Sequence, residues 1–139
     1  PPKPRFIVSG TEEEPQTSSR NHTRYTPYVQ LLEQLPQDAL LKIYIYFYPL
    51  FQTAYEQLGY RNAYFNDRLV NVIDHLLETP NPAEPIKLAQ PVVLLTYYNS
   101  LLEKRSAGQK IMLRIGPANR KKVKQVLKLY RDRLIKLQP

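Results

Sequence analysis

Apolar side chains recur at steps of three and four residues along most of this chain, which is the spacing of one face of an α-helix. Near the end of the chain, Val123, Val126, Leu127, Tyr130 and Leu134 share one such face, and lysines and arginines fill most of the other positions. Prolines and glycines, which commonly end helices, stand between these stretches. The pattern predicts helices at residues 26–35, 37–58, 66–78, 99–104, 106–116 and 117–137.

The second of these helices is rich in aromatic side chains, because nine of the fifteen Tyr and Phe residues of the chain fall in residues 44–65. A proline at position 49 removes a backbone donor and predicts a kink. An adjacent apolar row on this helix comprises Ile43, Phe47, Leu50, Ala54 and Leu58. The aromatic residues that follow the helical period are expected in the core of the protein: Tyr44, Phe47, Phe51 and Tyr55.

Polar residues at the predicted helix starts suggest specific caps. Thr26, followed by proline, is the expected N-cap of the first helix, and Asn66 that of the third. Ser106 and Gln109 match a capping box, in which the glutamine side chain reaches back to the cap residue. These positions give the helix boundaries a physical basis in the sequence.

The remaining segments are short and irregular. Residues 5–8 and 86–89 are expected to pair as a β-ribbon, residues 9–20 form a polar loop, and the state of residues 92–98 is ambiguous. We assign residues 1–24 to a linker end with an extended and loop segment, and residues 25–139 to a single helical domain. The predicted fold is mainly α, a compact bundle of five to six helices with at most one short two-stranded β-ribbon.

Charge is distributed unevenly along the chain, whose net charge is +8. Residues 1–103 carry eight Lys and Arg against eleven Asp and Glu, a net −3, whereas residues 104–139 carry twelve against one, a net +11. Such a basic helix either is a solvated face or attracts an acidic protein, an anionic membrane surface or, less favoured, a nucleic acid. The candidate contact residues on it are Lys121, Lys122, Lys124, Lys128 and Arg131.

Four tyrosines of the aromatic stretch fall outside the expected core positions. Tyrosine is enriched at binding hot spots, since it combines a large apolar ring with a polar hydroxyl. We therefore regard Tyr46, Tyr48, Tyr60 and Tyr64 as candidate partner-binding residues.

The sequence contains little that indicates catalysis. The chain has no cysteine, which excludes disulfides and thiolate metal sites, and its glycines are too scattered for a phosphate-binding loop. Asp67, Asp74 and His75 share one predicted helix and suggest either a metal or acid–base site or, more simply, a polar outer face. We assign no catalytic residue, no cofactor and no metal ligand.

Several segments together resemble an uncharacterised proteobacterial family, catalogued as domain of unknown function 3014. They are YTPYVQLL at residues 25–32, YPLFQTAYEQLGY at 48–60, YFNDRL at 64–69, IDHLLETP at 73–80, SAGQK at 106–110 and RIGP at 114–117. Residues 93–102 follow the family pattern only loosely. The resemblance implies an envelope protein with an N-terminal membrane anchor, a proline-rich linker and a domain that begins upstream of Pro1. No activity is established for the family, so it supplies no catalytic residue.

These observations favour a non-enzymatic interaction or scaffold module, and the resemblance implies that it belongs to the bacterial cell envelope, faces the periplasm and is anchored by a segment absent from this chain. It would bind a protein or an anionic membrane surface through the basic last helix and the exposed tyrosines. Two alternatives remain open, a nucleic-acid-binding helical domain and a hydrolase or metal-dependent enzyme that uses Asp67, Asp74 and His75. The sequence does not identify a partner or an oligomeric state.

Overall fold

The computed structural model describes residues 5–90 and 93–137 of the chain. Residues 1–4, for which we predict a linker end, and residue 92 of the ambiguous stretch lie outside this description. The described residues form seven helices and two short antiparallel sheets, so the prediction of a mainly α fold is confirmed. The helices are α1 (Arg20–Thr23), α2 (Thr26–Gln34), α3 (Gln37–Gln57), α4 (Phe65–Leu77), α5 (Ser100–Glu103), α6 (Ala107–Arg114) and α7 (Pro117–Leu134).

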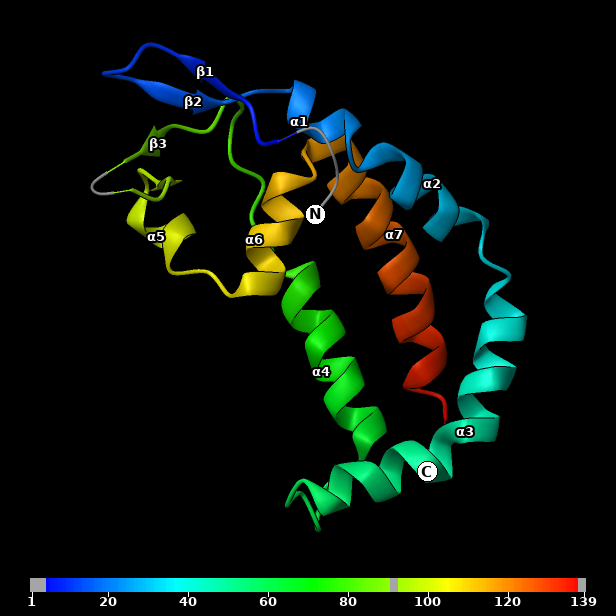
Figure 1. Ribbon diagram of the computed structural model, residues 1–139. Coiled ribbons are helices and arrows are strands. Elements are labelled where there is room, and N and C mark those ends of the chain that lie inside the picture. Colours follow the sequence, from blue (N-terminus) through cyan, green and yellow to red (C-terminus); the bar gives the residue numbers. More distant parts are fainter. Residues whose placement is uncertain (1–4, 91–92, 138–139) are drawn as a thin grey trace.

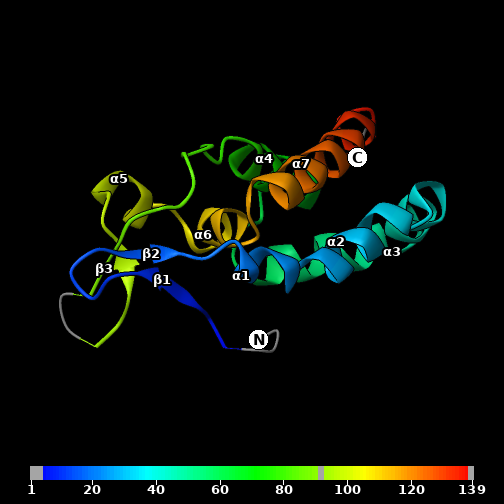
Figure 2. The same cartoon turned by 90° about the horizontal axis from the view of Figure 1, so that it is seen from above.

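The longer helices are arranged in two layers (Figures 1 and 2). Helices α4 and α7 pack against each other, and α2 packs along α7. Seen from above, α2 and α3 lie in one layer and α4 and α7 in the other. Helix α3 bends sharply near its middle, where Pro49 interrupts the backbone hydrogen bonds, as predicted.

The strands pair differently from the prediction. Strand β1 (Val8–Gly10) pairs with β2 (Pro15–Thr17), and β3 (Leu88–Ala89) pairs with β4 (Thr96–Tyr97). The expected pairing of residues 5–8 with 86–89 is therefore wrong, and the described residues hold two ribbons rather than one. The predicted loop is a hairpin, because Gly10 adopts a φ of +87° that lets the chain reverse direction. Strand β2 lies between the two predicted partners and reaches the second ribbon through a bridge from Gln16 to Lys87.

All three predicted caps differ from the prediction in part or in full. Ser106 accepts a hydrogen bond from the Gln109 amide, as predicted, but the Gln109 side chain donates to the His75 carbonyl instead of reaching back. Asn66 is not the cap of α4, since the helix begins at Phe65 and Asn66 is buried. Thr26 is likewise the first residue of α2 and not its cap.

The main cluster of buried apolar side chains lies at the end of the molecule that carries the ribbons. One cluster of buried side chains joins Ile86 and Leu88 of the ribbon region to Tyr97, Leu102 of α5 and Leu113 of α6. Val29, Ile73, Val126 and Leu134 are buried on α2, α4 and α7. Helix α3, all of whose residues are described, contains no fully buried side chain. The predicted core role of Phe47 and Phe51 is therefore wrong, because both rings are exposed.

Candidate docking surface on the aromatic helix

The inner face of α3 holds the start of α4 through one glutamine. Gln52 Oε1 accepts hydrogen bonds from the Phe65 amide at 2.8 Å and from the Tyr48 hydroxyl at 3.3 Å. Its Nε2 donates to the Ala63 carbonyl at 3.0 Å. The first amides of a helix lack intrahelical acceptors, so Gln52 supplies the cap for which we expected Asn66.

A second polar contact joins three helices. The Tyr44 hydroxyl donates to Asn66 Oδ1 at 3.0 Å, and Asn66 Nδ2 donates to the Leu134 carbonyl at 3.0 Å. Asp38, at the start of α3, forms an ion pair with Arg133 near the end of α7. These contacts determine where α3 sits on α4 and α7.

Aromatic rings fill the space around these contacts. The Tyr44 ring stacks on Phe51 with centroids 6.0 Å apart, and Phe51 lies 5.7 Å from Phe65 of α4. Tyr55 contacts Phe65 edge to face and stacks on Tyr60 with centroids 4.5 Å apart. These five of the nine aromatic residues of the stretch form one small cluster between α3 and α4, which accounts for the half-buried positions of Tyr44 and Tyr55.

The other apolar face of α3 is largely exposed. It is the row that runs next to the predicted core positions and that we call the outer row: Ile43, Phe47, Leu50, Ala54 and Leu58. Leu50 is 64% exposed and Leu58, which follows the last residue of α3, is 77% exposed. Single exposed apolar residues are common, but a continuous row is typical of a contact surface.

Some of the four candidate tyrosines lie near the outer row, and others lie near the contact between α3 and α4. Tyr46 is 79% exposed beside the outer row, with its ring 5.0 Å from that of Phe47. Tyr60 and Tyr64 are exposed in the turn between α3 and α4. Tyr48 is half-buried and contributes its hydroxyl to Gln52. Tyr46 is therefore the candidate best placed to contact a partner together with the outer row.

The predicted basic residues of α7 are mostly engaged within the chain. Lys122 pairs with Glu33 of α2 at 2.9 Å, and Arg131 binds both carboxylate oxygens of Asp74 on α4. The hydrogen bond with Asp74 raises the pKa of Arg131. The Lys124 ammonium donates a hydrogen bond to the Thr79 carbonyl. Burial lowers the pKa of Lys124, and the positive charge of Arg120 lowers it further.

Only two of the five predicted basic residues are left for a partner. Among the described residues, Lys121 and Lys128 are exposed and take part in no ion pair. Two separated lysines make a weaker contact surface on α7 than the five predicted residues together would.

One charged residue that the prediction missed is fully buried. Arg120 of α7 is 0% exposed, and burial lowers its pKa. Its Nε donates to Asn81 Oδ1 at 3.0 Å and its Nη1 to the Met112 carbonyl at 3.4 Å. The helical period contained the signal, because position 120 lies three residues before Val123 on the apolar face of α7. Arg120 and Lys124 together attach the proline-rich segment 79–85 to this helix.

Two of the three residues of the enzyme alternative have structural partners. Asp74 pairs with Arg131, and His75 Nε2 lies 2.8 Å from Ser106 Oγ at the start of α6. Asp67 is exposed near the start of α4. Within residues 5–90 and 93–137 no group of three or more His, Asp or Glu side chains is placed to hold a metal ion. The arrangement does not favour an acid–base or metal site here.

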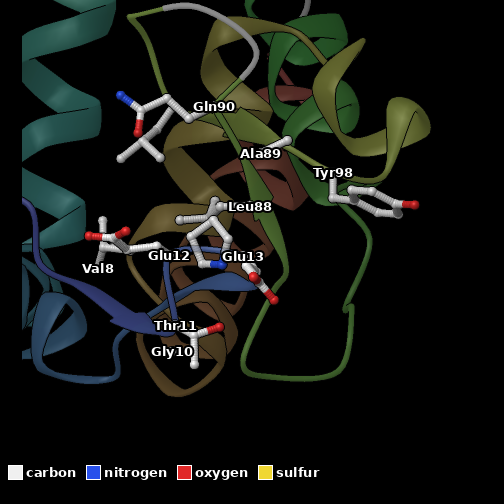
Figure 3. Close-up of a pocket in the computed structure, with 11 residues that line it drawn as sticks. Val8, Gly10, Thr11, Glu12, Glu13, Leu88, Ala89, Gln90 and Tyr98 are labelled. Atoms are coloured by element: carbon white, nitrogen blue, oxygen red, sulfur yellow. The ribbon is translucent and has the colours of Figure 1, made fainter.

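A shallow cleft of about 810 Å³ lies between the β1–β2 hairpin and the segment around β3 (Figure 3). The sequence did not indicate this cleft, although its acidic run contributes Glu12 and Glu13 to the lining. Thr11 and Tyr98 supply hydroxyls, and Leu88 and Leu95 supply apolar surface. Among the described residues, the lining contains no histidine, lysine or arginine, so the two glutamates have no basic partner there.

The hydroxyl of Tyr44 provides a test of the α3–α4 junction. Burial, followed by the neighbouring Tyr48, raises the pKa of Tyr44 from 10.0 to about 12. Folding then favours the neutral phenol, so its contribution to stability is complete below pH 10 and is lost as the pH rises from 10 to 12. In an ultraviolet titration of the folded protein, Tyr44→Phe should remove one late-ionising phenol.

Tyr97→Phe is the matched control for this titration. Burial also raises the pKa of Tyr97, which lies in the core and not at the α3–α4 junction. The Tyr97→Phe variant should therefore keep the phenol that ionises near pH 12. An unchanged number of late-ionising phenols in Tyr44→Phe would show that the junction is not formed as described.

Comparison with other proteins places the chain in a family. In the part of the chain that the structure describes, no helix is both long and apolar enough to cross a membrane. No curated protein and no solved structure matches the chain. The model of a family described as "Protein of unknown function (DUF3014)" matches residues 1–131, nearly the whole sequence, and the chain therefore belongs to this family.

Proposed function

We propose that this domain is a non-enzymatic interaction module of the bacterial cell envelope, and that it binds a protein through the outer row of α3 and Tyr46. The observation that carries the proposal is the exposed, continuous outer row on a helix whose adjacent face is fixed to α4 by Gln52 and Tyr44. A rigidly held apolar face is the form in which helices bind partner helices and grooves. The family resemblance supports the envelope location.

A protein partner fits the outer row better than a membrane surface does. Helices that lie in the membrane interface carry many lysines and arginines on their polar face. Helix α3 has Lys42 as its only cation, and its polar residues Gln52 and Tyr48 are already bonded at the α4 junction. The exposed lysines Lys121 and Lys128 lie on α7, in the other layer.

Site-specific photo-cross-linking in the cells of origin tests the proposal. A photo-reactive residue at position 46 of the full-length protein should give a covalent adduct with a protein. The same residue at position 101, where Leu101 of α5 is 69% exposed and apolar but outside the row, is the control. Equal or absent adducts at both positions would contradict the proposal. Separation of the same cells into envelope and soluble fractions tests the location.

A further inference from the structure

We infer that a second copy of this chain covers the outer row, with the two α3 helices antiparallel about a two-fold axis next to Leu50. This inference rests on the proposed function, since it uses the same surface and names the partner. Three properties of the row support it: the order of its side chains, the position of the kink and the absence of charge.

The order of side chains in the row makes it complementary to itself. In an antiparallel pair whose axis passes between positions 50 and 51, Ile43 lies opposite Leu58 of the second copy, and Leu50 lies beside its own counterpart. The large Phe47 then lies opposite the small Ala54, so that ring and methyl alternate along the contact. Interdigitation of large and small side chains is what permits close packing between two helices. A two-fold contact of this kind uses the same patch on both copies.

The bend in α3 has the position that such a pair requires. Pro49 precedes the central Leu50, and Figure 1 shows the helix turning near this point. A two-fold axis near the bend brings the bends of the two copies together and places the arm before the bend of one copy beside the arm after the bend of the other.

The electrostatics of the row also match a second copy. No Asp, Glu, Lys or Arg occurs between Lys42 and Glu56, so pairing brings no like charges together. A strongly acidic or basic partner would lose hydration of its charges against this surface without gaining an ion pair.

The area of the row indicates a weak dimer. Four large side chains that are each about half exposed offer roughly 400 Å² of apolar surface, against the roughly 800 Å² that a standard interface buries per partner. Tyr46, Thr53 and Gln57 lie along one edge of the row and add polar contact area. We therefore expect a dimer whose population rises with protein concentration.

A charge exchange at the two-fold axis tests the inference. Sedimentation of the 16.3 kDa chain over a range of concentrations should show the mass rising towards twice that value. Leu50→Glu and Leu50→Lys should each abolish the rise, because each places two like charges at the axis. An equimolar mixture of the two variants should restore the dimer as a one-to-one pair. Leu50 is exposed in the single chain, so both variants should keep the circular dichroism of the parent.

Leu101→Glu serves as the control, since it adds the same charge at an exposed apolar site on α5 and should leave the dimer intact. The inference is overturned if the parent chain stays monomeric at high concentration, if Leu50→Glu dimerises like the parent, or if the mixture fails to pair. An adduct at position 46 with a different protein, together with a monomeric parent chain, would overturn the dimer and leave the proposed function standing.

Discussion

Replacing Arg120 by methionine is expected to lower the free energy of unfolding by about 3 kcal/mol, because the variant leaves buried polar groups without their cation. Asn81 Oδ1 and the Met112 carbonyl each lose a donor. The negative charge of Glu84 raises the pKa of Arg120 and so partly offsets the effect of burial. In the variant, the Glu84 carboxylate loses this positive partner. Methionine retains most of the length of the side chain, so the loss reports polar contacts more than a cavity. Urea denaturation measures it.

Lys121→Met is the matched control, because it removes the same charge from the next residue of α7 at an exposed position. A change within about 0.5 kcal/mol is expected for this variant. Adding Glu84→Gln to Arg120→Met should recover part of the lost stability, since it removes the carboxylate left without a partner. Equal effects of Arg120→Met and Lys121→Met would show that Arg120 is not buried as described.

The buried arginine shows how far the sequence alone determines this fold. The helical period predicted α7 and its apolar face, and position 120 lies on that face. Net charge does not reveal which basic residues have intramolecular partners, since those partners are distant in sequence. Glu33 binds Lys122 from α2, and Asp74 binds Arg131 from α4. The basic patch expected from composition is reduced by contacts that depend on the tertiary arrangement.

The aromatic helix shows a different limit. Periodicity correctly identified two apolar rows on α3 and a kink at Pro49, but a helix with two apolar faces gives no sign of which face is covered. In the structure α4 covers only the face that carries Tyr44 and Gln52, so the outer row is exposed. The candidate docking surface therefore includes a residue that we predicted in the core, Phe47. Tyr46 is the residue of this surface that we predicted to contact a partner.

The short strands depended even more on long-range contacts. Strands of two or three residues carry too little pattern to select a partner. The Thr17 amide donates to the Ile86 carbonyl at 2.9 Å, and this contact places β2 where the prediction placed residues 5–8. The acidic loop that seemed irregular in sequence contributes the hairpin turn and one side of the cleft in Figure 3.

Asn66→Leu is expected to lower the free energy of unfolding by about 2 kcal/mol and to loosen α3 from the rest of the protein. Leucine has the same number of side-chain heavy atoms as asparagine and the same branching at Cγ, so the site stays filled. The Tyr44 hydroxyl, however, loses its acceptor and the Leu134 carbonyl loses one of its donors. Each buried polar group without a partner costs about 1–3 kcal/mol. The Leu137 amide still donates to the Leu134 carbonyl, which limits the loss at that atom.

Hydrogen exchange separates this local effect from a general loss of stability. The amides of α3 should exchange faster in Asn66→Leu under native conditions. The amides of α6 should lose protection only by as much as the global stability falls. Asn71→Leu makes the same substitution at an exposed site of α4 and should leave both regions unchanged. Because the outer row is useful to a partner only while α3 is held in place, Asn66→Leu should also weaken the concentration-dependent rise in mass. Unaltered exchange in α3 would mean that Gln52 and Asp38 alone hold the helix and that the contact of Tyr44 with Asn66 and Leu134 is dispensable.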